Sequence, residues 1–342
     1  MKTCGGNGEA IMDSNLSAVI CGGGGFIGGH LAGDLIRKGF RRVRVVDIKP
    51  LDQWYQVHPE AENIQADLNE RSAAFAAVKG MDLVWNLACN MGGMGFIEKN
   101  KGLCMISVLI NTHLLVAARE YGVKRYFYAS SACVYNADKQ KEKKLDVFLK
   151  EEDAYPAMPE DGYGWEKLFS ERMCRHFRED WNVPTRVARF HNVYGPYGTW
   201  DGGREKAPAA ICRKVIRAKL EGRHEIEIWG DGQQTRSFMY ITDCLHGIHL
   251  ITDSETWHDP INLGSAEGVT INQLVDIVEE IAGIRLKRIY NLDAPKGVNG
   301  RNSDNTLIRK VFGWEPRTPL RQGMEETYKW IYGEIINRRK SF

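Results

Sequence analysis

The sequence has no pair of cysteines at the spacing of a zinc site or of a redox-active disulfide. Its eight cysteines stand singly along 342 residues. Structural zinc sites and disulfide frameworks require cysteines at regular, paired spacings. We therefore expect free thiols, no bound metal, and a reducing, cytoplasmic environment.

The sequence also lacks an excess of charge of one sign. Its 46 lysines and arginines against 44 aspartates and glutamates give a formal net charge of +2, which argues against a nucleic acid as partner. No uninterrupted apolar run reaches the roughly 18 residues of a membrane span. Residues 1–14 do not combine a basic stretch with an apolar one, as a secretory signal does. We expect no membrane partner, and a flexible tail over residues 1–14.

What the sequence does contain is a regular alternation of short apolar runs with helical patterns. This alternation is typical of a parallel sheet with helices on both faces, a doubly wound α/β fold. After Gly195 the alternation fades, which predicts a smaller α/β lobe built on the carboxyl ends of the sheet. The predicted strands are 16–21, 43–48, 63–68, 83–88, 125–130 and 185–190, and the predicted helices are 27–39, 71–78, 106–121 and 163–177.

The change in pattern also suggests where the domains lie. We predict a first domain from residues 15–195 plus 234–260, and a smaller lobe from residues 196–233 plus 261–342. The charged segment 137–150 is expected to be a solvated loop or a surface hairpin.

A glycine-rich turn follows the first predicted strand. Gly22, Gly25 and Gly28 are spaced so that the backbone can turn tightly, approach a pyrophosphate and pack a helix against a strand. The turn lies between a strand and a helix, and an acid, Asp47, ends the next strand, which is the context of a dinucleotide-binding Rossmann fold.

The other cofactor contacts follow from this context. Asp47 is expected to accept both ribose hydroxyls and to favour NAD over NADP, although Arg44 and Lys49 stand close enough to favour a phosphate instead. Asp67 is expected beside the adenine. The predicted cofactor site also includes Phe26, Ile27 and Leu68.

Tyr163 and Lys167 lie one helical turn apart, on one face of a predicted helix. A nearby ammonium and the charge of a nicotinamide would lower the pKa of the tyrosine. Tyr163 is then suited to take a hydroxyl proton as hydride leaves the same carbon, and Lys167 to hold the nicotinamide ribose.

Together these features resemble the extended short-chain dehydrogenase/reductase family, also called the NAD-dependent epimerase/dehydratase family, whose members act on nucleotide sugars. The resemblance covers nearly the whole chain after the tail. It includes the Ser-Ser strand end at Ser130 and Ser131 and the segment 189–196. Five further loops resemble the GDP-mannose 3,5-epimerases of that family: residues 89–96, 128–133, 198–210, 229–238 and 300–305.

The resemblance implies how a sugar would be epimerised. Ser131 and Cys133 are expected on one face of a strand, because side chains alternate along it. Ser131 would hydrogen-bond the reacting hydroxyl. Cys133, partly ionised near NAD and a lysine, would be the base, and Lys206, from a flexible glycine-rich loop, the acid.

The expected cycle begins with Tyr163 and NAD, which oxidise C4 of the hexose. Cys133 and Lys206 then invert C3 and C5, which are acidic beside the ketone, and the hydride returns to C4. This cycle would convert GDP-α-D-mannose to GDP-L-galactose, with GDP-L-gulose from inversion at C5 alone.

The resemblance further implies a homodimer, formed through residues 106–121 and 163–177, and a set of substrate contacts. Arg236 and Arg301 suit the diphosphate, whereas His191 is expected to be a packing residue. The other substrate contacts that it implies are Gly92, Asn192, Glu205, Ala207, Lys214 and Gln234.

Three alternatives remain at this point. The substrate could be another GDP-sugar, such as a GDP-heptose. The chain could be a 4-epimerase or a 4,6-dehydratase, although a dehydratase would carry Asp-Glu where Ala132 and Cys133 stand. It could also be a non-catalytic NAD-binding regulator, which would be expected to have lost Tyr163, Lys167 or Cys133.

Overall fold

Seven parallel strands form the central sheet of the computed structural model, which describes residues 14–141, 147–295 and 297–340. Their order is β12-β7-β5-β4-β1-β2-β3, so the direction of winding reverses between β1 and β4. A crevice at such a switch point is where doubly wound sheets bind their ligands. The strands are β1 (Ser17–Cys21), β2 (Arg42–Asp47), β3 (Glu62–Gln65), β4 (Leu83–Asn86), β5 (Arg125–Ser131), β7 (Thr185–Phe190) and β12 (Ile261–Leu263).

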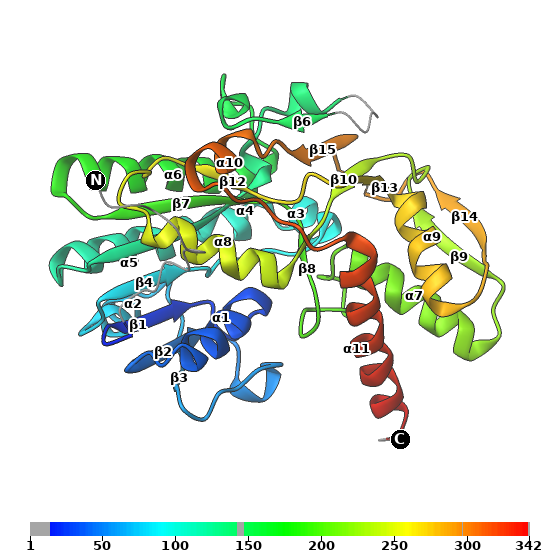
Figure 1. Cartoon of the computed structure of the whole chain (residues 1–342), viewed down its shortest axis with the longest axis horizontal. Coiled ribbons are helices and arrows are strands. Elements are labelled where there is room, and N and C mark those ends of the chain that lie inside the picture. Colours follow the sequence, from blue (N-terminus) through cyan, green and yellow to red (C-terminus); the bar gives the residue numbers. More distant parts are fainter. Residues whose placement is uncertain (1–13, 142–146, 296, 341–342) are drawn as a thin grey trace, which may run out of the picture.

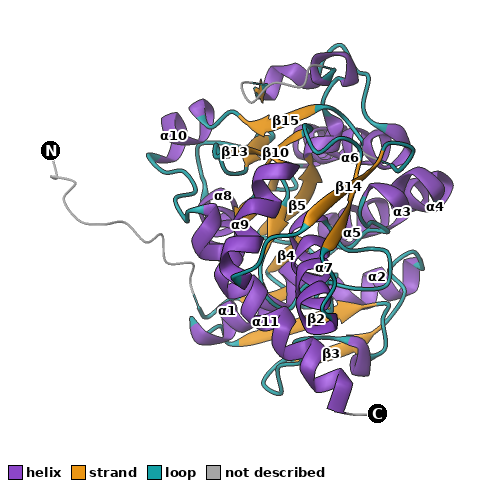
Figure 2. Ribbon diagram, turned by 90° about the vertical axis from the view of Figure 1, so that its right-hand side faces the viewer, coloured by secondary structure: helices purple, strands orange, loops and turns teal. Residues whose placement is uncertain are grey.

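Helices cover both faces of this sheet, as the alternating pattern predicted (Figures 1 and 2). Because side chains alternate along a strand, Ile20 packs with α1 and α8 on one face, and its neighbour Val19 packs with α2, α5 and α6 on the other. The helices of this part are α1 (Phe26–Arg37), α2 (Arg71–Val78), α3 (Met94–Lys99), α4 (Lys101–Ile106), α5 (Val108–Glu120), α6 (Asp161–Trp181), α8 (Ile241–Asp253) and α10 (Thr306–Phe312).

A second group of elements packs beside the sheet, around its own apolar core. Figure 1 shows this lobe next to the carboxyl ends of the strands, with α11 running along it to the C-terminus. Its helices are α7 (Ala207–Glu221), α9 (Ile271–Ala282) and α11 (Leu320–Lys340). Its strands form small sheets: β13 (Gly268–Thr270), β10 (Thr235–Ser237), β15 (Gly300–Ser303) and β6 (Phe148–Leu149) in one, β9 (Glu225–Trp229) with β14 (Lys287–Asn291) in another, and β8 (Val193–Tyr194) with β11 (Met239–Tyr240) in a third.

Two short strands lie on the other side of the predicted domain boundaries. β12 was assigned to the lobe, but it is the edge strand of the large sheet, where Ile261 pairs with Ala188. β10 was assigned to the first domain, but Thr235 pairs with Thr270 and Gly300 in the lobe. Strands of three residues are too short to carry a periodic signal, so tertiary pairing decides where they belong. The predicted return of the chain to the sheet through α8 is confirmed.

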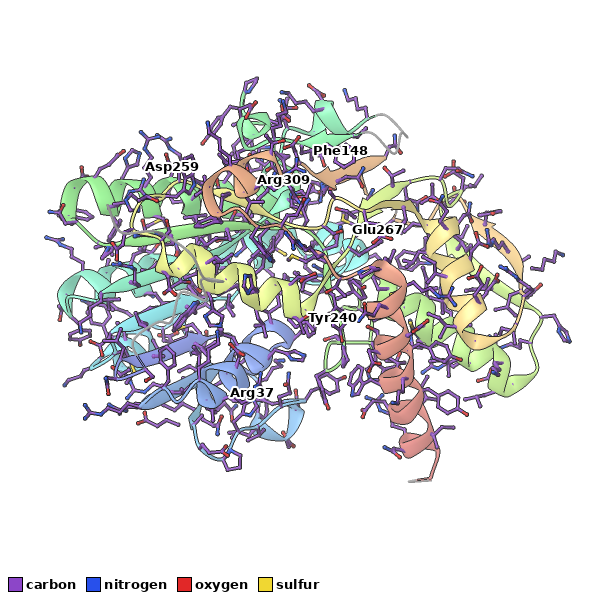
Figure 3. The ribbon with its side chains drawn as sticks, in the orientation of Figure 1. Arg37, Phe148, Tyr240, Asp259, Glu267 and Arg309 are labelled. Carbon is purple, nitrogen blue, oxygen red and sulfur yellow. The ribbon has the colours of Figure 1, made fainter. Side chains whose placement is uncertain are left out.

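The segment 137–150 is more ordered than a solvated loop. Residues Ala137–Gln140 form a 3-10 helix, and Gln140 is fully buried. Phe148 pairs with Asn302 at the edge of the small sheet, with its own side chain turned outward (Figure 3). Residues 142–146 lie outside the described part of the chain.

The helix predicted at 106–121 begins earlier and continues, with one turn residue at Ser107, from Lys101 to Glu120. This stretch is long and apolar enough to cross a membrane by length and composition alone, with a mean hydropathy of 1.6. Polar residues such as Asn111 and His113 divide its apolar residues, so it contains no uninterrupted apolar run of membrane-spanning length. Leu114 and Leu115 are fully buried against the sheet, so the core helix of a folded domain accounts for the composition.

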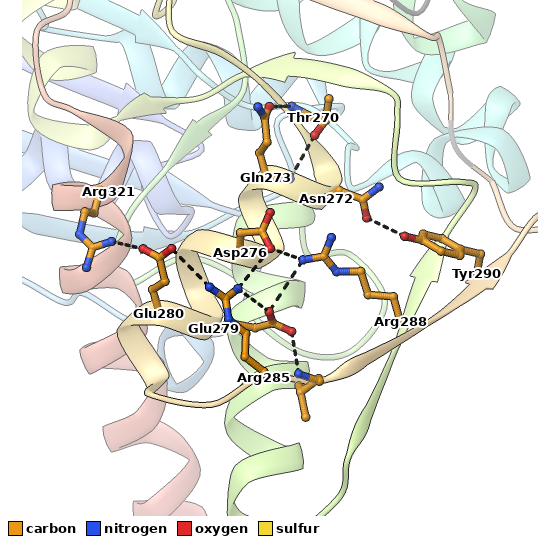
Figure 4. Close-up of polar contacts among 11 residues, drawn as sticks. Thr270, Asn272, Gln273, Asp276, Glu279, Glu280, Arg285, Arg288, Tyr290 and Arg321 are labelled. Atoms are coloured by element: carbon orange, nitrogen blue, oxygen red, sulfur yellow. Dashed lines mark hydrogen bonds and ion pairs between the residues drawn. The ribbon is translucent and has the colours of Figure 1, made fainter.

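Polar contacts fix the ends and the outer face of α9 in the lobe (Figure 4). The Thr270 hydroxyl accepts a hydrogen bond from the Gln273 N–H at 3.0 Å, and the Gln273 side chain accepts one from the Thr270 N–H at 2.8 Å. This capping box satisfies two N–H groups that a helix start would otherwise leave unpaired. Arg288 of β14 and Arg321 of α11 pair with acids of α9, so the three elements are held together.

Candidate active site

A pocket of about 320 Å³ opens where the sheet meets the lobe. Ser131 and Cys133 at the end of β5, Tyr163 on α6 and Lys206 before α7 all line it. Every residue predicted to contact the substrate also lines it: Gly92, Asn192, Glu205, Ala207, Lys214, Gln234, Arg236 and Arg301. The structure therefore gathers residues from seven separate segments of the chain at one place.

The glycine turn lies at the switch point between β1 and β4, where the backbone is packed too closely for side chains. A Cβ added to Gly22, which has φ +84°, would lie 2.8 Å from the backbone nitrogen of Ala88. One added to Gly28 would lie 2.5 Å from the carbonyl oxygen of Gly22, which Gly25 also contacts through a 3.1 Å hydrogen bond. Only glycine fits these positions, so the backbone can reach a pyrophosphate at the start of α1.

The acid at the end of β2 is placed for a ribose. Asp47 is 7% exposed, and one of its oxygens accepts the Lys49 N–H at 3.0 Å. Arg44 does not offer a phosphate site, because its guanidinium pairs with Glu62 and donates to the Ala77 carbonyl at 2.8 Å. The Lys49 ammonium donates to the Gly24 carbonyl at 2.7 Å. This arrangement fits NAD better than NADP.

The remaining cofactor residues lie around the same turn. One carboxylate oxygen of Asp67 accepts the backbone and side-chain N–H groups of Asn69 at 2.9 and 2.8 Å. The Leu68 side chain packs in the core. Phe26 and Ile27 begin α1 and pack against the core.

The residues after Ser131 do not continue the strand, so the prediction that Ser131 and Cys133 share one face of a strand is wrong. Ala132–Val134 form a 3-10 turn, and the Ser131 hydroxyl accepts the Cys133 N–H at 3.2 Å. A serine hydroxyl that accepts a nearby backbone N–H in this way occupies a donor that would otherwise pair with a neighbouring strand. Ser131 and Cys133 both reach the pocket, but through the turn and not through a shared strand face.

The cation in contact with the Cys133 thiol is Arg301. Its Nη1 donates to the Cys133 sulfur at 3.3 Å. Burial raises the pKa of Cys133, and Arg301 opposes this effect. Lys206 lies near enough to be affected by the same thiol, and burial lowers the pKa of its ammonium. A lysine of lowered pKa gives up its proton more readily, which suits a general acid.

The pKa of the Tyr163 phenol shifts in the direction opposite to the one that the sequence predicted. Burial raises its pKa well above the usual range, and the nearby Cys89 and Cys133 thiols add to the rise. Lys167 lies 5.7 Å from the Tyr163 ring centre and donates to the Ala129 carbonyl at 3.1 Å. The protein alone therefore does not produce the lowering of the Tyr163 pKa that the spacing predicted.

The glycine-rich loop that carries Lys206 is held by several hydrogen bonds. The Glu205 carboxylate accepts the Gly203 N–H at 2.7 Å and pairs with Arg213 of α7. The Gly93 N–H donates to the Arg204 carbonyl at 3.1 Å. These contacts tie the loop both to α7 and to the segment after β4.

Several predicted substrate residues already have protein partners. Lys214 donates to the Glu227 carbonyl at 2.8 Å, and Asn192 to the Ser237 carbonyl at 3.1 Å. Gln234 donates to the Trp229 carbonyl at 2.9 Å, and its buried Oε1 has no hydrogen-bond partner within the described residues. A buried acceptor of this kind at a pocket wall is suited to a ligand donor.

Other side chains lie close to the predicted catalytic residues although no motif indicated them. Glu160 and Gln140 contact Arg301 behind the Cys133 thiol. Glu166, which is 3% exposed, lies 3.6 Å from the Lys167 ammonium. Glu160 and Gln140 are far from Arg301 in the sequence, so no spacing rule could find them. His191 is fully buried against Asn262 at 3.0 Å, as expected of a packing residue.

Comparison with known proteins decides the family. Residues 18–264 match the model of the NAD dependent epimerase/dehydratase family. The chain belongs to that family. NAD is accordingly its cofactor, and the glycine turn with Asp47 remains the predicted place for it.

Within the epimerase/dehydratase family, several curated proteins align with most of this chain. GDP-mannose 3,5-epimerase 1 of Oryza sativa subsp. japonica is 44% identical over 317 residues, covering 92% of this chain and 82% of that protein. GDP-mannose 3,5-epimerase of Arabidopsis thaliana is 43% identical over 322 residues, covering 94% and 83%. These relatives are isomerases by name.

Solved structures show the same fold. UDP-glucose 4-epimerase of Thermotoga maritima superposes with a TM-score of 0.82 at 23% identity, covering 94% of this chain and all of that one. MoeE5 in complex with UDP-glucuronic acid and NAD superposes with a TM-score of 0.77 at 28% identity, covering 93% and 99%.

Proposed function

We propose that this enzyme inverts C3 and C5 of a GDP-hexose, converting GDP-α-D-mannose to GDP-L-galactose, with GDP-L-gulose formed by inversion at C5 alone. The observation that carries the proposal is the meeting of Cys133, Lys206 and Tyr163 in one pocket. The plant GDP-mannose 3,5-epimerases, 43–44% identical to this chain, support the choice of substrate.

The first task of the site is proton removal from the C4 hydroxyl. Tyr163 is the base: burial raises the pKa of its phenol, and a hydrogen bond with the Ser131 hydroxyl acts in the opposite direction by favouring the ionised form. Bound NAD would supply the acceptor for the C4 hydride and the donor for its return. The buried Lys167, whose pKa Cys89 and Glu166 raise against the opposing effect of its burial, stays charged to attract the phenolate.

The second task is proton exchange at the carbons beside the C4 ketone. A thiolate at Cys133 takes the proton from C5 or C3, and the resulting enolate is planar at that carbon. Lys206 returns a proton to the opposite face, which inverts the centre. Each step is general acid–base catalysis, for which a lysine with a lowered pKa and a thiol beside an arginine are suited.

The decisive experiment is incubation with GDP-mannose in deuterated water, with the sugar analysed by NMR. We expect deuterium at C3 and C5 and none at C4. Cys133→Ala should abolish the exchange, whereas Cys104→Ala, a buried cysteine in the same cluster, should retain it. An absence of deuterium at both carbons would refute the proposal.

The same assay separates the alternatives. A 4-epimerase would invert C4 without placing deuterium at C3 or C5, and a 4,6-dehydratase would yield a 6-deoxy product. Faster exchange with a GDP-heptose than with GDP-mannose would reassign the sugar, and a preference for UDP-sugars would reassign the nucleotide. A non-catalytic regulator would show no exchange at all.

We also propose that the enzyme is a homodimer formed through α4, α5 and α6. Leu103, Ile106 and Leu109 are exposed on the first two helices, and Trp165 and Phe169 on the third, which packs against them. An apolar face spread over adjacent helices is suited to a second copy of the chain.

Sedimentation velocity tests the dimer. Phe169→Glu should yield monomers, because it places a charge in the middle of the apolar face. Leu292→Glu changes a still more exposed residue of the lobe and should leave the dimer intact. A monomeric wild-type protein, or a dimeric Phe169→Glu variant, would contradict the proposal.

A cytoplasmic location, without a membrane or nucleic-acid partner, completes the proposal. The described cysteines are all free, which suits a reducing compartment. Fractionation of cells that express the tagged protein tests this point, and recovery in the membrane fraction would contradict it.

A further inference from the structure

The guanidinium of Arg301, which lines the pocket, is held by three different groups. Its Nε donates to the Gln140 side chain at 2.7 Å, its Nη1 to the Cys133 sulfur at 3.3 Å, and its Nη2 to the Glu160 carboxylate. The side chains of Arg301 and Glu160 are 7% and 12% exposed. One cation therefore serves both a carboxylate and the catalytic thiol in a site largely shielded from water.

Each partner of Arg301 is itself fixed. The Gln140 amide donates to the carbonyls of Tyr135 and Asn136, both at 3.2 Å, so that its oxygen faces the guanidinium. Arg301 pairs with β10 through its backbone, within the small sheet of the lobe. The guanidinium cannot move toward one anion without weakening its contact with the other.

The backbone of Glu160 keeps its carboxylate beside Cys133. The Glu160 N–H donates to the Cys133 carbonyl at 3.0 Å, and the Glu160 carbonyl accepts the Gly164 N–H at 2.9 Å. Glu160 is thus linked to the turn of the thiol and to the first turn of the helix that carries Tyr163. It is not among the residues that line the pocket, so it lies behind the thiol.

We propose that Glu160 is a positioning residue for the epimerisation: it shares Arg301 with Cys133, and this sharing sets how tightly the thiolate holds a proton. This inference rests on the proposed function. If Arg301 faced the thiolate alone, the thiolate would be abundant but weakly basic. If Arg301 paired with Glu160 alone, little thiolate would form. Sharing keeps the base between these limits, which is what general base catalysis requires.

The electrostatic effects agree with this arrangement. Arg301 lowers the pKa of Cys133, and Glu160 raises it, on top of the rise due to burial. Arg301 likewise lowers the pKa of Glu160 in spite of its burial. The other titratable groups that face Cys133 come from several elements: Tyr163 from α6, Lys206 from the loop before α7, Arg236 from β10 and Cys104 from α4.

The test is the pH dependence of Cys133 alkylation in the full-length protein. Iodoacetamide reacts with the thiolate, and peptide mass spectrometry reports the modification of this cysteine alone. Glu160→Gln keeps the shape and removes the charge. We expect its alkylation profile to shift to lower pH, with at least threefold faster modification at pH 7. The acid limb of the deuterium-exchange profile should shift in the same direction.

Two further variants make the result specific. Glu152→Gln alters an exposed glutamate shortly before Glu160 and should leave both profiles unchanged. Gln140→Glu places a second carboxylate on Arg301 and should shift the alkylation profile to higher pH. The inference predicts shifts of opposite sign for Glu160→Gln and Gln140→Glu. If one of these variants fails to fold, the direction of the shift in the other still tests the inference.

The outcomes separate this inference from the proposed function. An unchanged profile, or a shift to higher pH, in Glu160→Gln would overturn the inference even if deuterium exchange occurs. The expected shift without any exchange at C3 or C5 would mean that Glu160 tunes the thiol but that the epimerase assignment is wrong. A purely structural role for Glu160 would change the melting temperature without moving either profile.

Discussion

The ion pair between Arg189 of β7 and Glu171 of α6 allows a quantitative test of the fold behind the site. Both residues are 3% exposed, and two parallel hydrogen bonds of 2.9 and 2.8 Å join them. The Glu171 carboxylate also accepts the Ser130 hydroxyl at 2.5 Å, one residue before Ser131. Arg189→Leu would leave this carboxylate buried without its cation.

Removal of one partner of a buried ion pair costs about 3–5 kcal/mol. An unfolding entropy of roughly 2.1 cal/mol/K per residue gives about 0.7 kcal/mol/K for 342 residues. A loss of about 4 kcal/mol therefore corresponds to a fall in melting temperature of about 6 °C. Calorimetry at one protein concentration, with NAD absent from all samples, measures this fall.

The double variant Glu171→Leu/Arg189→Leu is the matched control. Replacing a whole buried pair by apolar side chains is often neutral or stabilising, although the Ser130 hydroxyl loses its acceptor. We expect the double variant to recover at least half of the lost melting temperature. A fall below about 1 °C in the single variant, or no recovery in the double, would refute the reasoning.

Three further substitutions test the site more briefly. Gly22→Ala would press a Cβ against the backbone of Leu87 and Ala88, so NAD affinity measured by titration calorimetry should fall at least tenfold, about 1.4 kcal/mol; unchanged affinity would place the cofactor elsewhere. Gly164→Ala would put a Cβ 2.3 Å from the Cys133 carbonyl, so deuterium exchange should slow at least tenfold in a protein that still folds. Burial lowers the pKa of His191 to about 3, against about 6.5 in the unfolded chain. Between these two pH values only the unfolded state binds the proton, so the stability of the folded protein falls as the pH falls from about 6.5 to about 3. His191→Gln has no such titrating group, so the difference in unfolding free energy between the wild type and this variant should be smaller at pH 4.5 than at pH 7.5. An equal difference at both pH values would show that His191 does not titrate in this way.

Sequence reasoning recovered the large sheet well, because its strands and helices carry long periodic patterns. The predicted helix 71–78 coincides with α2, and the predicted strand 185–190 with β7. It placed β10 and β12 in the wrong part, since three residues carry no period and only their pairing partners decide. The buried polar side chain of Gln140 was missed in a segment whose lysines suggested solvent.

The residues of the site also fall into those that local sequence patterns predict and those that only the folded chain brings together. Motifs on contiguous residues, such as the glycine turn and Tyr163 with Lys167, follow from local spacing. The substrate contacts came from the resemblance alone, because they lie on loops that only the folded chain brings together. Glu160 was found by neither route, because it meets Cys133 and Arg301 only in the folded chain, and Arg301 is 141 residues further along.

The turn at Ala132–Val134, and not strand periodicity, brings Cys133 to the pocket. Continued strand pairing would have directed the Cys133 N–H and carbonyl to neighbouring strands. In the turn they bind instead the Ser131 hydroxyl and the Glu160 N–H. The first contact holds the thiol at the pocket, and the second brings the start of α6, with Tyr163, against the same turn. Because Gly164 has no side chain, the helix can approach the Cys133 carbonyl this closely. Tyr163 and Cys133, the residues proposed for hydride transfer and proton exchange, are therefore held at one backbone junction, so their relative position does not depend on the lobe that carries Lys206.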